Sequence, residues 1–577
     1  MQPVLLETLP ERTLPADRDG AAVLTKPRPF AATLTIGVPI PISSAPASQS
    51  ARVAKPGDAT LALSDALDPR QPDTWWLSLL LVLPWLSPYT AGPTPNEWPW
   101  LFSAFCAVGL WLFQHRFNAR LIAGTWVLAA AVSAVIALAQ YFGLAPVLSP
   151  WVSQTAPGEA FANLRQRNQF ATLTSIGLIA LIALIAWRAR TAPAKPVPWS
   201  ASLLVALLAL GNAASSSRTG LLQWLLVLAL TAWWAWWARA DFKSRRGPLM
   251  LAVQALLAYG LAVAALPWLL SLVTGLSSDG LFGRLTEQAG CGSRLVLWSN
   301  VLTLIGQKPG LGWGWGELDY AHFITLYPGP RFCEILDNAH NLPLQLAVEL
   351  GVPAALAICL AALWLVWRAK PWRETDTLRQ MAWAVLAVIA MHSLLEYPLW
   401  YGPFQIAFAL CVGLLWASAG HSTQKYQEKQ INSGLSQWLR VLIAIIIIAT
   451  LLTMAVSYHR VSQIYLPPEA RMAAYRDDPL KQIQGNWLYR NQARFAELST
   501  TALTPENAAA QYAMARALLH YSPEPRTIEK LIESAVMLGL DDEGVQYLAR
   551  FRAAFPQEHA RWARAQALQN SPPKAIR

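Results

Sequence analysis

The stretch QFATLTSIGLIALIALIAW, residues 169–187, contains no charged side chain and is long enough to cross a bilayer as a helix, which takes roughly 17 to 25 residues. Comparable apolar runs lie on both sides of it, near 75–90, 98–114, 121–142, 199–214, 219–237, 249–274, 342–367, 379–397, 402–419 and 438–457. Together they predict an all-α polytopic membrane protein with about eleven transmembrane helices, ten and twelve being also compatible with the pattern.

The overall composition supports a membrane protein and argues against a nucleic-acid-binding one. Hydrophobic residues make up 54% of the chain and charged residues only 14%, with a mean hydropathy of +0.31, so much of the surface must face lipid. The net charge of +11 comes from basic residues in short loops between apolar runs, where topology explains them better than nucleic acid does. Membrane lipids are therefore the expected surroundings.

The distribution of positive charge predicts the orientation of the helices. Basic residues gather in alternate loops, at His115, Arg116 and Arg120; Arg188, Arg190 and Lys195; Arg239, Lys243, Arg245 and Arg246; Arg368, Lys370 and Arg373; and Lys425 and Lys429. Such loops stay in the cytoplasm. In a bacterial inner membrane this would place the N-terminus inside, and it would place 90–97, 143–168, 215–218, 275–341, 398–403 and the C-terminal tail on the periplasmic side.

Three domains are expected along the chain. Residues 1–72 are rich in Pro, Ala, Ser and Thr without helical periodicity and lack a signal-peptide pattern, which favours a disordered cytoplasmic tail. Residues 73–457 form the transmembrane domain. Residues 458–577 alternate apolar and charged positions at helical spacing, which predicts a small soluble helical domain in the periplasm. Helix-turn-helix units like those of a tetratricopeptide array are compatible with it, but one or two weak copies do not establish a repeat.

The segment 275–341 is the longest loop of the membrane region. Loops beyond about 15 residues without regular structure are usually functional. It carries Cys291 and Cys333, which would face an oxidising compartment. A disulfide between them and a pair of free thiols both remain open.

The motif DNAHNLP, residues 337–343, joins this loop to the next apolar helix. A helix start presents free backbone N–H groups and a partial positive charge, which favours a phosphate, and an imidazole there can accept a proton from a hydroxyl. His340, flanked by Asn338 and Asn341, is therefore the first candidate catalytic residue. A hydrogen-bonded structural histidine is the alternative.

Arginines predicted on the same side of the membrane form a second group. They are Arg165, Arg167, Arg218, Arg284, Arg294 and Arg331. Guanidinium groups bind phosphate oxygens bidentately and stay charged, so these residues are candidates for holding a diphosphate. For any one of them, contact with lipid headgroups or a role in loop structure is the alternative.

A third group interrupts an apolar run in MHSLLEYPLWYGPF, residues 391–404. Ionisable residues within membrane segments are functional candidates, which singles out His392 and Glu396. Their i, i+4 spacing also allows a structural pair on one helical face. Tyr397 and Tyr401 follow, while Gln166 and Asn168 in the loop before 169 offer neutral hydrogen bonds to sugar or phosphate.

No metal or cofactor is expected. Glu317, Asp319 and Asp337 are scattered through the long loop without the spacing of metal ligands. A site that holds a diphosphate with arginines does not need a divalent ion to neutralise it.

Six motifs in a fixed order resemble the O-antigen ligase superfamily, and within it the bacterial protein O-oligosaccharyltransferase branch often called PglL-type. They are LPWLSPYTAGPTPNEW, ANLRQRNQFATL, SSSRTG, SRLVLWSNVLTLIGQKPGLGWGWGEL, DNAHNLPLQLAVELG and HSLLEYPLWYGPF, spread over roughly 75–480. Members of this family usually begin closer to the first helix, so the Pro-rich lead is a departure.

The resemblance implies a membrane-embedded glycosyltransferase of the GT-C type that uses glycan preassembled on undecaprenyl diphosphate. By position, His340 resembles the family's essential loop histidine, and Arg218 and Arg294 resemble the arginines that hold the diphosphate. Gln166 and one of Tyr397 and Tyr401 match positions that family members need for activity. The acceptor hydroxyl would attack the anomeric carbon while His340 accepts its proton or orients the diphosphate.

Three functions remain in view. The first is transfer to Ser or Thr of an exported protein such as a pilin. The second, by the same chemistry, is ligation of O-antigen to lipid A core or glycan polymerisation. A transporter or flippase is a third, although its polar groups would line several helices at mid-depth. The sequence does not identify the glycan, the acceptor, its motif or the oligomeric state.

Overall fold

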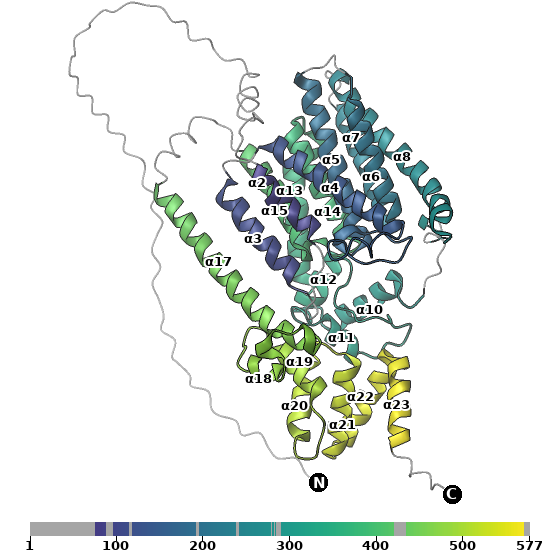
Figure 1. Ribbon diagram of the computed structural model, residues 1–577, viewed down its shortest axis with the longest axis vertical. Coiled ribbons are helices and arrows are strands. Elements are labelled where there is room, and N and C mark those ends of the chain that lie inside the picture. Colours follow the sequence, from purple (N-terminus) through teal and green to yellow (C-terminus); the bar gives the residue numbers. More distant parts are fainter. Residues whose placement is uncertain are drawn as a thin grey trace, which may run out of the picture. The chain divides into compact units, whose positions relative to one another are not determined.

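A computed structural model describes residues 75–87, 96–114, 118–191, 196–237, 242–277, 280–281, 283, 290–419 and 434–569, without the side chains of 242–245, 419, 434–436 and 568–569. The chain divides into two units, 1–62 and 63–577. The whole of the first unit and of the predicted N-terminal tail 1–72 lies outside the described residues, as does Arg284. The described part is all-helical and contains no strand (Figure 1).

The membrane region is a bundle arranged around one central helix. Its helices are α2 (Trp75–Leu86), α3 (Trp98–Leu112), α4 (Ala119–Tyr141), α5 (Arg167–Thr191), α6 (Trp199–Ala214), α7 (Arg218–Trp237), α8 (Phe242–Thr274), α13 (Val352–Ala369), α14 (Thr377–Ser393), α15 (Gly402–Ala419) and α17 (Gly434–Ser462). Helix α5 packs against α4, α6, α7, α8 and α14 and is buried along most of its length. Small residues let the backbones approach, since a Cβ at Gly177 of α5 would collide with Ala130 of α4.

Six of the described helices are long and apolar enough to cross a membrane, namely Ala119–Tyr141, Arg167–Thr191, Arg218–Trp237, Arg246–Thr274, Val352–Arg373 and Gln437–Tyr465. Four shorter apolar helices accompany them. The prediction of an all-α, multi-pass membrane protein is thus confirmed, whereas the count of about eleven spans stays a prediction.

The run 342–367, which the apolar pattern predicts as one helix, is two helices. Helix α12 (Leu342–Leu350) ends at Gly351, whose φ of +87° an L side chain rarely adopts, and α13 (Val352–Ala369) starts anew. The 309–316 segment lies against the break, where Val352 donates its N–H to the carbonyl of Pro309 at 2.8 Å. A Cβ at position 351 would overlap the Gly310 carbonyl, so only glycine fits there.

The loop predicted at 275–341 folds into a small unit of its own. Helices α10 (Arg294–Gln307) and α11 (Leu318–Ile324) share an apolar core with Phe332, Leu336 and Val348. Cys291 and Cys333 form a disulfide with a Cα–Cα distance of 5.5 Å.

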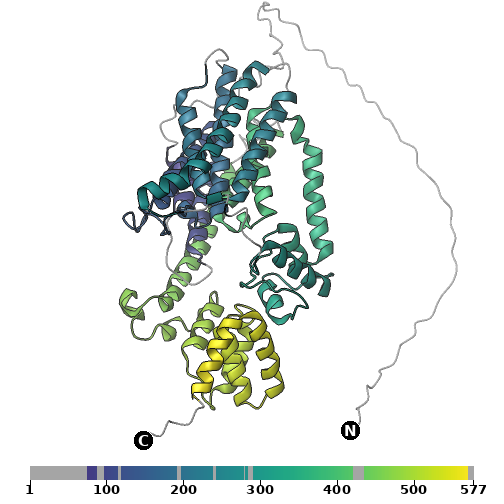
Figure 2. The ribbon, with the colours of Figure 1, turned by 90° about the vertical axis from the view of Figure 1, so that its right-hand side faces the viewer.

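The C-terminal region contains α18 (Pro479–Ile483), α19 (Arg490–Thr500), α20 (Ala508–Leu518), α21 (Pro525–Met537), α22 (Asp541–Ala554) and α23 (Pro556–Gln569), with α20 to α23 stacked side by side (Figure 2). Phe323 of α11 is buried in its apolar core. His520 lies 2.7 Å from Glu317 and stacks on Tyr320. The loop unit and the C-terminal helices are therefore held together by apolar packing and by the contact between His520 and Glu317. The boundary at 458 and the solubility of this region stay predictions.

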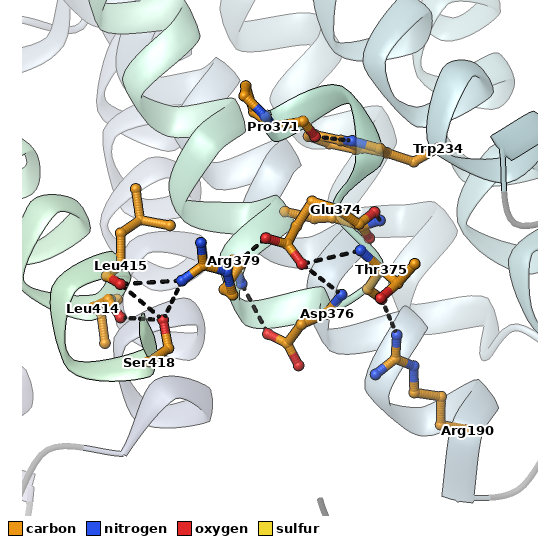
Figure 3. A network of polar contacts seen from close by, with 11 residues as sticks. Arg190, Trp234, Pro371, Glu374, Thr375, Asp376, Arg379, Leu414, Leu415 and Ser418 are labelled. Carbon is orange, nitrogen blue, oxygen red and sulfur yellow. Dashed lines mark hydrogen bonds and ion pairs between the residues drawn. The ribbon is translucent and has the colours of Figure 1, made fainter. Parts of the chain in front are cut away.

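A network of hydrogen bonds and an ion pair stabilises the segment that connects α13 to α14 (Figure 3). Glu374 pairs with Arg379 at 2.5 Å, and Arg379 also donates to the carbonyl of Leu415 and the hydroxyl of Ser418 in α15. Arg190 at the end of α5 donates to the carbonyl of Thr375 at 2.6 Å. Since α5 begins at Arg167, this network lies at the opposite end of the bundle from that residue.

Candidate functional site

The carboxylate of Glu396 is the point at which separate parts of the chain meet. Gln166 and Asn168 each donate a side-chain amide N–H to it at 3.1 Å, to Oε2 and Oε1 respectively. Arg294 forms an ion pair with Oε1, and Nε2 of His340 lies 3.4 Å from Oε2. The Glu396 side chain is only 5% exposed, so its charge is balanced by these four groups rather than by bulk water.

These groups face a cavity of about 910 Å³. Its wall comes from α5, α7, α10 and the segments around His340 and Glu396, and it is formed by Gln166, Arg167, Asn168, Arg218, Thr219, Leu222, Gly290, Gly292, Ser293, Arg294, Leu295, Leu297, Phe332, Glu334, His340, Leu395 and Glu396. The cavity is large enough for a diphosphate with part of a sugar.

Three helices begin at the cavity with an arginine. Arg167 is the first residue of α5, Arg218 of α7 and Arg294 of α10, while Asn341 caps the start of α12 by accepting the N–H of Leu344 at 3.1 Å. Helix starts carry a partial positive charge, which adds to the charge of the three arginines and faces the carboxylates of Glu334 and Glu396 in the same wall. Arg167 is partly neutralised by an ion pair with Glu159.

Nη1 of Arg294 is buried, and in the described part of the chain it has no hydrogen-bond partner. Buried donors are nearly always paired in folded proteins. The arginine therefore has hydrogen-bonding capacity left over beside the cavity, beyond its ion pair with Glu396.

The backbone around the cavity adopts the left-handed conformation at several non-glycine residues. These are Ala162 (φ 52°), Arg165 (φ 63°), Ser216 (φ 51°) and His340 (φ 51°). Such conformations cost free energy and persist where the surroundings enforce them, commonly at binding sites.

Buried amides enforce the turn before α5. Gln140, fully buried in α4, accepts the N–H groups of Phe161 and Ala162 at 3.0 and 2.7 Å and donates to the carbonyls of Ser153 and Ala162. Sequence reasoning missed Gln140, although a glutamine inside an apolar run was the available signal. The turn that it holds leads into Gln166 and Asn168.

His340 is oriented by its neighbours. Its backbone N–H donates to Oδ1 of Asn338 at 2.7 Å, and its Nδ1 lies 2.9 Å from the carbonyl oxygen of Asn338. Tyr397 packs edge-on against the imidazole with a centroid distance of 5.1 Å. Tyr401 stacks behind Tyr397 at 5.9 Å, so Tyr397 is the tyrosine next to the histidine.

Asn341 supports the site through the backbone. In addition to capping α12, it donates from Nδ2 to the carbonyl of Leu394 at 3.0 Å. This bond ties the histidine segment to the segment that carries Glu396. The disulfide acts similarly, since Cys291 and Cys333 lie beside the cavity-lining residues Gly290, Gly292 and Glu334.

The pairing of His392 with Glu396 that their spacing allows does not form. Helix α14 ends at Ser393, so Glu396 turns away from the helical face and into the cavity. His392 is buried, with Nδ1 at 2.9 Å from the hydroxyl of Thr172 in α5. Thr172 in turn accepts from Gln223 of α7 at 2.8 Å, so His392 joins three helices below the site.

Two of the predicted arginines lie away from the cavity wall. Arg331 donates to the carbonyls of Thr325 and His322 at 2.9 and 2.8 Å and holds the loop unit together, and burial lowers its pKa to about 10. Arg165 ends the turn Ala162–Leu164 and is not among the lining residues. The structure thus brings together Arg167, Arg218 and Arg294 and leaves Arg331 in a structural position.

The described residues include no group of three or more His, Cys, Asp or Glu side chains that could hold a metal ion. The donor set around the cavity is instead made of guanidinium, amide and imidazole N–H groups with one central carboxylate. Such a set can bind a multiply charged anion and can exchange a proton with a bound hydroxyl.

Three family descriptions match successive parts of the chain. "Protein glycosylation ligase" matches residues 160–185, "O-Antigen ligase" matches 203–359 and "Virulence factor membrane-bound polymerase, C-terminal" matches 380–570. The first two cover the segments that carry Gln166, Arg218, Arg294 and His340. They confirm the resemblance to the O-antigen ligase superfamily and its protein-glycosylating branch.

Two similar proteins come from Acinetobacter baylyi (strain ATCC 33305 / BD413 / ADP1). A "General O-oligosaccharyltransferase" is 26% identical over 305 residues, which cover 51% of this chain and 50% of that protein. A "ComP-specific O-oligosaccharyltransferase" is 27% identical over 309 residues, which cover 52% and 53%. The chain therefore spans about half the length of these relatives. No solved structure matches it.

Proposed function

We propose that this protein transfers a preassembled oligosaccharide from undecaprenyl diphosphate to a Ser or Thr hydroxyl of an exported protein such as a pilin. The observation that carries the proposal is the meeting of Arg294, His340 and Glu396 at one cavity that three arginines line. The resemblance to the O-antigen ligase superfamily and the names of the two relatives support the reaction type.

The donor diphosphate would be bound by the arginines and helix starts of the cavity. Arg218 and Arg294 stand at the first residues of α7 and α10, where side-chain and backbone charge act together. The unpaired Nη1 of Arg294 is a ready donor for a phosphate oxygen. This charge would stabilise the leaving lipid diphosphate without a metal ion.

The reaction joins the acceptor oxygen to the anomeric carbon as the bond from that carbon to the diphosphate oxygen breaks. His340 would accept the hydroxyl proton or orient the diphosphate, and Tyr397 would hold the imidazole in place. Burial raises the pKa of Tyr397, so its hydroxyl stays protonated and can serve as a hydrogen-bond donor.

The site would face the periplasm of a bacterial inner membrane. Arg190 and Arg373 belong to the loops with concentrated positive charge, and Arg190 lies in the last turn of α5, whereas Arg167 at the first residue of α5 lines the cavity. Basic loops stay in the cytoplasm, so the cavity would open on the other side. The transmembrane domain at 73–457 and the C-terminal domain at 458–577 are proposed on the same topology.

Ligation of O-antigen to lipid A core, or glycan polymerisation, is the alternative. The matched descriptions "O-Antigen ligase" and "Virulence factor membrane-bound polymerase, C-terminal" favour it. The chemistry at the cavity would be the same, and only the acceptor differs. A transporter or flippase is not favoured by the matched descriptions, which name ligases and a polymerase.

The test is co-expression of the wild type or His340→Ala with a lipid-linked glycan pathway and a candidate pilin, in a host that lacks its own ligase. Mass spectrometry then follows glycan on the pilin and on lipopolysaccharide. Glycan on pilin with the wild type alone supports the proposal. Glycan on lipid A core instead makes the protein an O-antigen ligase, and glycan on neither contradicts both.

A further inference from the structure

Glu396 is the one carboxylate that contacts the proposed catalytic histidine among the described residues, and the proposed reaction assigns it no chemical step. It lines the cavity yet is almost fully buried. Burying a carboxylate costs free energy unless its partners compensate. If the position were only structural, a neutral residue of the same shape, such as glutamine, would cost less free energy to bury.

The hydrogen bonds of His340 define which ring nitrogen faces Glu396. Nδ1 lies 2.9 Å from the carbonyl oxygen of Asn338, which can only accept, so Nδ1 carries a proton. Nε2 lies 3.4 Å from Oε2 of Glu396. The imidazole and the carboxylate therefore line the same cavity side by side.

We propose that Glu396 is the group that takes the proton of the acceptor hydroxyl, and that Arg294 and His340 leave it for the diphosphate when the lipid-linked donor binds. This inference rests on the proposed function and assigns the proton within the same site.

Donor binding supplies the electrostatic reason for the exchange. A diphosphate brings more negative charge than one carboxylate and accepts bidentate bonds from Arg294, whose Nη1 is unpaired. Once Arg294 and His340 turn to the diphosphate, Glu396 keeps only the neutral amides of Gln166 and Asn168. A carboxylate with fewer positive neighbours in a buried site is a better proton acceptor.

The two amides remain in place because other groups hold them. Oδ1 of Asn168 accepts the hydroxyl of Ser217 at 2.6 Å, and Gln166 follows the turn Ala162–Leu164, whose first residue is hydrogen-bonded to Gln140. They therefore keep the carboxylate directed at the cavity while Arg294 and His340 move.

In the chemical step, a lone pair of the acceptor oxygen forms the new bond to the anomeric carbon. The electron pair of the broken carbon–oxygen bond stays on the leaving lipid diphosphate. The hydroxyl proton passes to the Glu396 carboxylate and leaves with the products when Arg294 returns. No oxidant, reductant or metal is needed.

The experiment measures transfer by purified full-length protein with a lipid-linked donor and an acceptor peptide, comparing the wild type, Glu396→Gln and Glu396→Asp. We expect Glu396→Gln to lower kcat by roughly 10² to 10⁴-fold with the donor KM unchanged or lower, because the competing anion is gone. Glu396→Asp keeps a carboxylate and should retain more of kcat. Glu374→Gln, which changes another arginine-paired carboxylate, is the matched control and should transfer at the wild-type rate per folded molecule.

A second measurement separates chemistry from positioning and does not depend on Glu396→Gln. Formate or acetate should restore transfer by Glu396→Ala in a concentration-dependent way and should leave His340→Ala unchanged. Retention of more than half of the wild-type kcat by Glu396→Gln, loss of donor binding, or no rescue would overturn the proposal. Absence of transfer by the wild type would instead contradict the proposed function itself.

Discussion

The two ends of the bundle each contain an arginine paired with a glutamate, yet the two pairs have different surroundings. At the α13–α14 connection, both oxygens of Glu374 are used, Oε2 by Arg379 and Oε1 by the N–H groups of Thr375 and Asp376. At the other end, Glu396 and Arg294 face a cavity of about 910 Å³.

The difference lies in what else the two pairs contact. Nη1 of Arg379 donates to the carbonyl of Leu415 and the hydroxyl of Ser418, which fixes the end of α15 (Figure 3). Arg294 has a buried donor without a partner in the described part of the chain. A pair whose arginine is hydrogen-bonded to a neighbouring helix stabilises a connection, whereas a pair with an unpaired donor beside a cavity is arranged to receive a ligand.

The strongest test of this contrast is His340→Ala at the cavity end. Transfer should fall by roughly 10² to 10⁴-fold because the imidazole either moves a proton or holds the diphosphate. The melting temperature should stay near that of the wild type, since His340 is only partly buried. Glycosylated pilin is quantified by mass spectrometry at equal protein levels. More than half of wild-type transfer would remove His340 from the mechanism.

Substitution of the arginine in each pair should affect different properties, activity at Arg294 and stability at Arg379. Arg294→Ala should lower transfer by about 10²-fold, the usual effect of removing one group that stabilises developing charge. Arg379→Ala should leave transfer per folded molecule unchanged but lower the free energy of unfolding by roughly 1.5 to 3 kcal/mol, because it removes hydrogen bonds to a charged group. Transfer assays and thermal unfolding in the same detergent compare the two. If Arg294→Ala and Arg379→Ala lowered transfer and stability to the same extent, the two arginine–glutamate pairs would not differ in function.

Removing the disulfide should loosen the cavity wall. Cys291 and Cys333 are 42 residues apart, so Cys333→Ser should destabilise the loop unit by roughly 2 to 4 kcal/mol. Proteolysis of the loop with and without a reductant measures this. Cys411→Ser, at a buried free cysteine of α15, is the control and should be insensitive to the reductant.

The loop unit should also respond to pH. Burial lowers the pKa of His322 to about 3, below its usual value near 6.5. Because the folded state holds the histidine neutral, its contribution to stability is complete above pH 6.5 and decreases as the pH falls towards 3, by about 1.4 kcal/mol per pH unit. Hydrogen exchange of α10 and α11 between pH 7 and pH 5 checks this, and His322→Gln should flatten the dependence.

The smallest effect is expected at the closed end. Trp234 donates its indole N–H to the carbonyl of Pro371 at 2.9 Å. Trp234→Phe removes this one bond and should cost about 1 kcal/mol of stability without changing transfer. A loss of transfer as large as that of Arg294→Ala would show that the two ends are coupled.

Much of this protein follows from the sequence alone because the relevant signals are local. An uncharged run such as 169–187 needs its backbone bonds satisfied within itself in lipid, so helix and membrane placement follow from composition. The motifs around His340, Arg218 and Arg294 likewise indicated where to expect chemistry.

Only the tertiary structure decided which of these residues meet. Gln166 and Glu396 are 230 residues apart in the chain, and their contact depends on how α5 packs beside the segment after α14. Helix α14 ends at Ser393, so the side chains of His392 and Glu396 do not pair. Arg331 is hydrogen-bonded within the loop unit and does not line the cavity. Periodicity and charge specify each helix by itself, but a site built from several helix starts is defined by their packing, which no local pattern encodes.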